Sequence, residues 1–160
     1  MLSPSDIAKY FLIRTEEDGN LISPLRMQKL VYFAYVSYLL KNKGKDRLFE
    51  EKIEAWPAGP VIPSLYRELK KYGSMPIDAK SYVDITKEKL LEKCSKEVLE
   101  LLDRVYEACE QFTAFQLMLV SHKERAWINA RKGLAPNASS NNLLLDKEIL
   151  AQHLKKNERC

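Results

Sequence analysis

The stretch that decides the fold of this chain runs from Gln28 to Tyr66. It begins Gln28-Lys29-Leu30-Val31-Tyr32, continues without a further charged residue to Leu40, and closes with Glu54-Ala55-Trp56-Pro57-Ala58-Gly59-Pro60-Val61-Ile62-Pro63-Ser64-Leu65-Tyr66. The first part is apolar nearly all round, which is typical of a helix at the centre of a fold. The second part is a corner of tryptophan, glycine and proline. Neither part resembles a catalytic motif, so the stretch points toward shape and recognition.

The composition indicates one globular domain over residues 1–160. An apolar fraction of 46% and a charged fraction of 30% are ordinary for a folded protein of this length. The net charge is +4, and the basic residues are scattered along the chain. This charge permits an acidic partner but does not require nucleic acid.

The chain is expected to be cytoplasmic. Its three cysteines are odd in number and have no metal-ligand spacing: Cys94, Cys109 and Cys160. Asp6 and Lys9 interrupt the N-terminal apolar residues, which argues against a signal peptide. The longest uncharged segment, Leu30 to Leu40, is too short to span a bilayer. The glycines are isolated, so no phosphate-binding loop is expected. We therefore predict no membrane association, no cofactor and no metal.

Helix signals dominate the sequence. Ser3-Pro4-Ser5-Asp6 and Ser23-Pro24 predict two helix starts, and Ser121-His122-Lys123-Glu124 has the pattern of a capping box, with Trp127 facing inward. The predicted helices cover residues 3 to about 16–20, 23 to about 42, 60 or 63 to 73, 95–112, 113 to about 120, 121 onward and 146 onward. The fold class is mainly α: a single-domain bundle of about six to seven helices with a minor two-stranded β element.

Two segments are candidates for the strands. Lys52–Trp56 and Ser81–Thr86 alternate weakly and are expected to pair with each other. Between Pro57 and Pro63, the prolines and Gly59 are expected to prevent any regular element from crossing the corner.

Three clusters of residues resemble one known family. They are Leu25-x-Met27-Gln28-Lys29-Leu30-Val31-Tyr32-Phe33-Ala34, Ile53-Glu54-Ala55-Trp56-x-x-Gly59-Pro60-Val61-x-Pro63-x-x-Tyr66, and Ser121-His122-x-Glu124-x-x-Trp127-x-x-Ala130-Arg131. In this order they resemble the Panacea-domain family of SocA-like antitoxins and GepA-like phage-associated proteins. The resemblance covers roughly residues 3 to 154. It departs at Pro57-Ala58, where aromatic or basic residues are commoner, and at Ser121, where threonine is commoner.

The resemblance implies a helical domain that neutralises a toxin by binding it. In the SocA-like case the antitoxin also delivers its toxin to a cytosolic protease, and other relatives are phage-associated. The residues that match the family motifs are Gln28, Lys29, Leu30, Tyr32, Trp56, Gly59, Pro60, Tyr66, His122, Glu124, Trp127 and Arg131. We interpret most of them as structural.

The tyrosines of the long central helix are candidates for partner contact. Tyrosine supplies a large contact area at low entropic cost. Tyr32 is better explained by core packing, whereas for Tyr35 and Tyr38 packing and partner contact are equally reasonable. The corner from Trp56 to Tyr66 is read first as a turn of the chain and second as a docking loop.

His122 and Glu124 come nearest to catalytic chemistry. A histidine at a helix start has a lowered pKa, and a neutral imidazole can act as a base or a ligand. Helix capping nevertheless explains the pair more simply. Ala126 occupies the position where a second ligand would be needed, which excludes a helical zinc pair. Cys109 lies on an apolar helix stripe and is read as a small buried hydrophobe.

Three functions remain open from the sequence. The first is a non-enzymatic antitoxin that binds a protein toxin, with Tyr35, Tyr38, Arg125 and Arg131 as candidate contacts. The second is a DNA-binding regulator that uses Arg125 and Arg131 on a helix-turn-helix-like pair. The third, disfavoured, is a small hydrolase that uses His122 or Cys109. The sequence does not name the toxin or give the oligomeric state.

Overall fold

The computed structural model describes the backbone of residues 1–158 and the side chains of residues 1–153. Over this range the chain forms nine α-helices, one short 3-10 helix and one two-stranded sheet. The elements are α1 (Pro4–Glu17), α2 (Pro24–Lys41), β1 (Glu54–Trp56), β2 (Gly59–Val61), α3 (Pro63–Leu69), η1 (Lys70–Tyr72), α4 (Ala79–Tyr82), α5 (Lys87–Glu92), α6 (Lys96–Cys109), α7 (Ala114–His122), α8 (Arg125–Ala130) and α9 (Asp146–Glu158). The prediction of a mainly helical fold with a minor two-stranded element is confirmed. The short helices α4 and α5 add to those expected.

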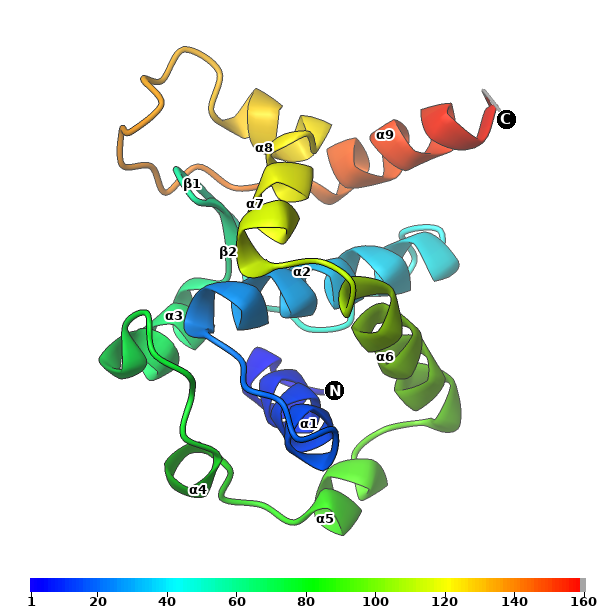
Figure 1. The fold of residues 1–160 in the computed structure, drawn as a ribbon. Helices are drawn as coiled ribbons and strands as arrows, with labels where there is room; N and C mark the ends of the chain where they lie inside the picture. The colour runs from blue at the N-terminus through cyan, green and yellow to red at the C-terminus, as the bar shows by residue number, and fades with distance from the viewer. Residues whose placement is uncertain (159–160) are drawn as a thin grey trace.

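The central helix is α2, as its all-round apolar sequence predicts. It packs against α1, α3, α6, α7, α9 and β2, and Figure 1 shows it crossing the middle of the molecule between α1 and α7. Its fully buried apolar residues include Met27, Val31, Tyr32, Ala34 and Leu39. These six elements are thus arranged around α2.

Hydroxyl caps start three of the helices that pack on α2, namely α1, α6 and α7. Ser3 accepts a hydrogen bond from the backbone of Asp6, whose carboxylate reaches back to the Ser3 backbone. Thr113 and Gln116 make the same reciprocal pair at the start of α7. Such caps satisfy backbone N–H groups that the first helical turn leaves unpaired. The predicted starts of α1 and α7 are confirmed.

The prediction that no regular element crosses the proline-rich corner is wrong. Strands β1 and β2 form a tight antiparallel hairpin in which Ala55 lies opposite Pro60. The N–H of Ala55 donates instead to Asn142 O at 2.8 Å, outside the hairpin. At this pair the missing N–H of Pro60 therefore costs no bond between the two strands, which is why a proline fits there.

The predicted strand at Ser81–Thr86 is also wrong. The segment instead contains the end of α4 and the residue that caps α5. Asp78 accepts a hydrogen bond from the N–H of Lys80, and Thr86 accepts one from the N–H of Lys89. These local caps outweigh the weak β pattern of the segment. The partner of β1 is therefore β2, with Asn142–Leu144 bonded to the other edge of β1.

No helix in the described part of the chain combines the length and the apolar character needed to cross a membrane.

Gly59 provides a test of the hairpin. Its φ of +111° is unfavourable for other residues, and a Cβ there would lie 2.6 Å from Ser121 Oγ and 2.7 Å from Lys29 Nζ. We expect Gly59→Ala to destabilise the protein by about 3 kcal/mol or more, through backbone strain and overpacking. Urea denaturation followed by circular dichroism measures the change.

Gly19→Ala is the matched control for this prediction. Gly19 follows α1 with a positive φ, of +71°, and a Cβ there would meet nothing within 4 Å. It should cost about 1 kcal/mol, from the left-handed backbone alone. Equal losses in the two variants would show that close packing around Gly59 does not hold the hairpin.

Candidate functional site

The residues of the three sequence clusters converge on the β1–β2 hairpin. Four of their side chains donate hydrogen bonds to backbone carbonyls of the hairpin and of the residue that follows it. We call these four side chains the hairpin clamp: Gln28, Lys29, Trp127 and Arg131. They bond to the carbonyls of Ile62, Pro60, Trp56 and Ala55 respectively. The carbonyls of Ala55 and Pro60 point away from the opposite strand, because this pair makes no bond across the hairpin, and they need donors from outside it.

Gln28, on α2, both donates a hydrogen bond to the backbone of Ile62 and accepts one from it. Its Nε2 donates to Ile62 O at 3.1 Å, and its Oε1 accepts from Ile62 N at 3.0 Å. Both groups are buried, so losing either partner would leave an unsatisfied polar group, at a cost of about 1–3 kcal/mol. Gln28 thereby fixes the end of β2 where α3 begins.

Lys29 is the most unusual residue of the clamp. Its side chain is 0% exposed, and Nζ donates to Pro60 O at 3.3 Å. No carboxylate lies within ion-pair distance of Nζ among the described side chains. Burial therefore lowers the pKa of Lys29 to about 7. Gly59 permits this arrangement because a side chain there would collide with Nζ.

Trp127 and Arg131 close the clamp from α8 and the loop after it. Trp127 Nε1 donates to Trp56 O at 2.8 Å. Arg131 is only 7% exposed, and its Nη1 donates to Ala55 O at 2.8 Å. Its Nη2 donates to Ala135 O at 3.0 Å and to Ala138 O at 2.9 Å. The guanidinium thus ties the hairpin to the loop that follows α8.

His122 lies beside the hairpin, but not at a helix start. It is the last residue of α7, and its ring stacks on Trp127 with centroids 4.3 Å apart. Ser121 Oγ donates to Met118 O, so the serine continues α7 and does not cap a new helix. The pKa of His122 is lowered first by burial and next by the charge of Lys29, while the carbonyls of Pro57 and Ala58 oppose the shift. The expected capping box and helix-start explanation are wrong.

Glu124 does not cap α8 through its side chain. Its carboxylate accepts a hydrogen bond from Gln152 Nε2, and the backbone N–H groups of Arg125 and Ala126 donate to Gln152 Oε1. The cap of α8 therefore comes from α9. Sequence reasoning missed Gln152 because it lies 26 residues beyond Ala126, outside any local pattern.

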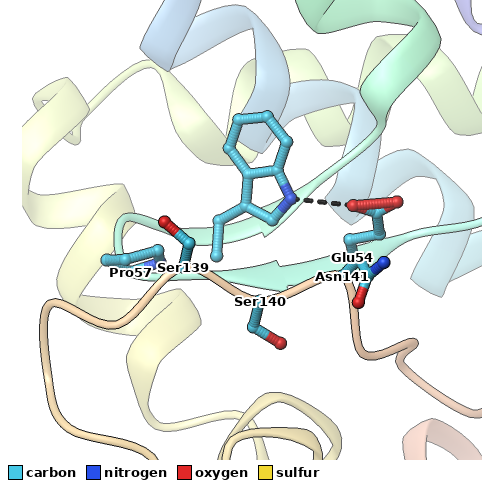
Figure 2. Close-up of a pocket in the computed structure, with 6 residues that line it drawn as sticks. Glu54, Pro57, Ser139, Ser140 and Asn141 are labelled. Carbon is cyan, nitrogen blue, oxygen red and sulfur yellow. Dashed lines mark hydrogen bonds between the residues drawn. The ribbon is translucent and has the colours of Figure 1, made fainter.

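The outer side of the hairpin presents aromatic and polar groups. Trp56 and Tyr66 meet edge to face with ring centroids 4.8 Å apart, and Tyr66 is 43% exposed. Trp56 Nε1 donates to Glu54 Oε1 at 3.0 Å. A groove of about 450 Å³, which we call the Trp56 groove, separates this side from the loop after α8. Figure 2 shows its lining residues: Glu54, Trp56, Pro57, Ser139, Ser140 and Asn141.

The other candidate contact residues differ in accessibility. Tyr32 is fully buried, and its hydroxyl has no hydrogen-bond partner within the described part of the chain. Tyr35 is 4% exposed and donates to Asp146 at 2.7 Å, which leaves it unavailable to a docking protein. Tyr38 is half-buried and donates to Asp46 at 2.8 Å. Of the two arginines, Arg125 is exposed and Arg131 is buried.

The structure does not support Cys109 as a nucleophile. The residue is 7% exposed, and burial raises the pKa of its thiol. A raised pKa lowers the fraction of reactive thiolate. Among the described residues no group of three or more metal-ligating side chains occurs.

Comparison with known proteins gave one match. The family model described as "Antitoxin SocA-like, Panacea domain" matches residues 27–128, which is more than half of the chain. No curated protein and no solved structure matched. The matched range contains Gln28, Lys29 and Trp127 of the clamp, and Arg131 follows it.

Lys29 predicts a specific pH dependence of stability. An unfolded lysine has a pKa near 10.5, so between pH 7 and 10.5 the unfolded chain binds more protons at this site than the folded protein. The Lys29 contribution therefore makes the folded state more stable as the pH rises through this range. Below pH 7 the cost of burying the charge is fully present. Lys29→Met removes this contribution.

We expect the free energy of unfolding of wild type relative to Lys29→Met to increase by about 2 kcal/mol between pH 7 and pH 9. Denaturation of both proteins at each pH measures the difference, in which titrations of other groups cancel. Lys96→Met, at an exposed lysine, is the control and should leave the pH dependence of wild type unchanged. A constant difference between wild type and Lys29→Met would contradict the prediction.

Proposed function

The chain belongs to the antitoxin SocA-like, Panacea domain family, and we propose on this basis that it neutralises a cognate protein toxin by binding it directly. Family membership is the observation that carries the proposal. Four of the motif residues donate to backbone carbonyls, which supports a scaffold role for them and leaves exposed faces free for a partner. An antitoxin of this kind would act in the cytoplasm, beside a toxin encoded by a neighbouring gene.

The outer side of the hairpin is the proposed contact surface. Tyrosine and tryptophan are enriched among the residues that dominate binding energy in protein interfaces. The clamp holds the hairpin in one conformation, so binding there would cost little ordering entropy. Tyr66 and the rim of the Trp56 groove are accessible from solvent. Tyr38 and Arg125 are further accessible candidates, whereas Tyr35 and Arg131 serve the interior.

Delivery of the toxin to a cytosolic protease is a finer proposal that comes from the resemblance to SocA-like antitoxins. It predicts that the toxin's half-life in cells shortens when this protein is co-expressed, and lengthens again when the protease is deleted. An unchanged half-life together with restored growth would mean neutralisation by binding alone.

A role in DNA binding has less support. Its two principal arginines were Arg125 and Arg131. Arg131 directs its guanidinium at the carbonyls of Ala55, Ala135 and Ala138, which leaves it unable to reach a phosphate without breaking the clamp.

Co-expression with the product of the neighbouring gene tests the proposed function. Growth should be restored, and the two proteins should co-purify. Trp56→Ala combined with Tyr66→Ala should weaken binding by at least about 30-fold, measured by calorimetry, because the variant removes the aromatic pair. The Trp127 bond survives in this variant, since it goes to the backbone carbonyl of Trp56.

Leu21→Ala is the control, because it removes a side chain that is 77% exposed and lies outside the hairpin. It should leave affinity and growth rescue unchanged. A neighbour that is harmless when expressed alone, or that forms no complex with this protein, would refute the antitoxin role. Full affinity of the Trp56/Tyr66 double variant would refute the proposed surface.

A further inference from the structure

A second groove lies between the C-terminal half of α2 and α6. Its volume is about 660 Å³, within the range of roughly 300–1,000 Å³ found for binding pockets. We call it the α2–α6 groove. Its lining residues are Ser37, Leu40, Lys41, Leu101, Arg104, Val105 and Ala108.

The floor of the groove is apolar, with one side contributed by α2 and the other by α6. Leu101 and Val105 are buried, and Leu40 is half-buried beside them. Ser37 on α2 and Ala108 on α6 are small, so an approaching backbone can come close to both helices. Small residues at facing positions are a common feature of close helix packing.

The groove lies where α2 meets α6. Among the described residues its lining contains none from α1, α3, α7, α9 or β2, the other elements that pack on α2. Figure 1 shows α6 meeting α2 on the side away from the hairpin. The apolar part of the lining is unfavourable in water until a partner covers it.

The charges at the groove have one sign. Its two charged lining residues, Lys41 and Arg104, are cationic and exposed. Lys43 and Lys45 are also exposed in the loop that follows α2. None of these four cations takes part in an ion pair among the described side chains. The acids of α6 do not line the groove.

We infer that the α2–α6 groove docks an amphipathic helix of a partner protein, with apolar side chains on the floor and carboxylates against Lys41 and Arg104. A helix seated in an apolar groove is a recurrent mode of recognition, and the cationic rim selects acidic flanks. The inference rests on the proposed function only in identifying this partner with the toxin. Nucleic acid fits less well, because the floor offers apolar groups where phosphates would need donors.

Two fluorescent peptides of about 18 residues, long enough for five helical turns, test this chemistry. Both carry leucines at the i, i+3, i+4 and i+7 spacing, and they differ only in having glutamate or lysine beside the leucines. With the full chain, the glutamate peptide should bind at least about 10-fold more tightly in fluorescence anisotropy. Lys41→Glu combined with Arg104→Glu should abolish the preference. Ala108→Trp should block both peptides by filling the groove.

Lys96→Glu combined with Lys123→Glu is the charge-matched control, because it makes the same change in net charge at exposed residues outside the groove. It should leave the preference intact, and thermal unfolding checks that each variant is folded. Equal binding of the two peptides, no binding of either, or full binding to Ala108→Trp would overturn the inference. Tighter binding of a single-stranded RNA than of the glutamate peptide, lost in the Lys41/Arg104 variant, would assign the site to nucleic acid instead.

The growth assay separates this inference from the proposed function. Failure of wild type to neutralise the neighbouring gene product, with peptide discrimination intact, refutes the antitoxin role and leaves the groove assigned. Growth rescue by the Lys41/Arg104 variant as complete as by wild type, with no peptide discrimination in wild type, refutes the groove and leaves the antitoxin role standing.

Discussion

The carbonyl groups of one short hairpin constrain much of this structure. The hairpin presents backbone acceptors that its two strands cannot satisfy between themselves. Gln28 and Lys29 from α2, with Trp127 and Arg131 from the far end of the chain, supply the donors. Each donor fixes the place of its own element relative to the hairpin. The position of α2 against α7 and α8 is therefore set by polar bonds as well as by apolar packing.

The burial of Lys29 is the most costly part of this arrangement. A fully buried amine is costly when, among the described side chains, no carboxylate lies within ion-pair distance and its hydrogen bond is as long as 3.3 Å. The cost is reduced because burial lowers the pKa of Lys29 to about 7, which lets the amine become neutral. Gly59 and Ser121 complete the packing around it. Four motif residues thus support the hairpin, and the proposed partner surfaces are the exposed faces at the Trp56 groove and the α2–α6 groove.

The last helix, α9, is also joined to the rest of the fold by side-chain hydrogen bonds. Gln152 of α9 caps α8 and donates to Glu124, while Asp146 at the start of α9 accepts from Tyr35 of α2. Glu124 and Tyr35, which the sequence offered as candidate site residues, therefore form hydrogen bonds that join α9 to the rest of the fold. The local pattern predicts a capping box at Ser121–Glu124, but the side chain of the distant Gln152 makes the cap instead.

The sequence by itself determined the mainly helical class, the central role of α2, the starts of the major helices and the resemblance to the family. These properties depend on capping residues and apolar periodicity, which act over a few positions. Only the tertiary structure decided the pairing of β1 with β2, the burial of Lys29 and Arg131, and the end of α7 at His122. For the two buried cations the reason is distance along the chain, 31 residues from Lys29 to Pro60 and 76 from Arg131 to Ala55. The hairpin itself is local, but it tolerates Pro60 only because the opposite N–H, that of Ala55, bonds to the distant Asn142.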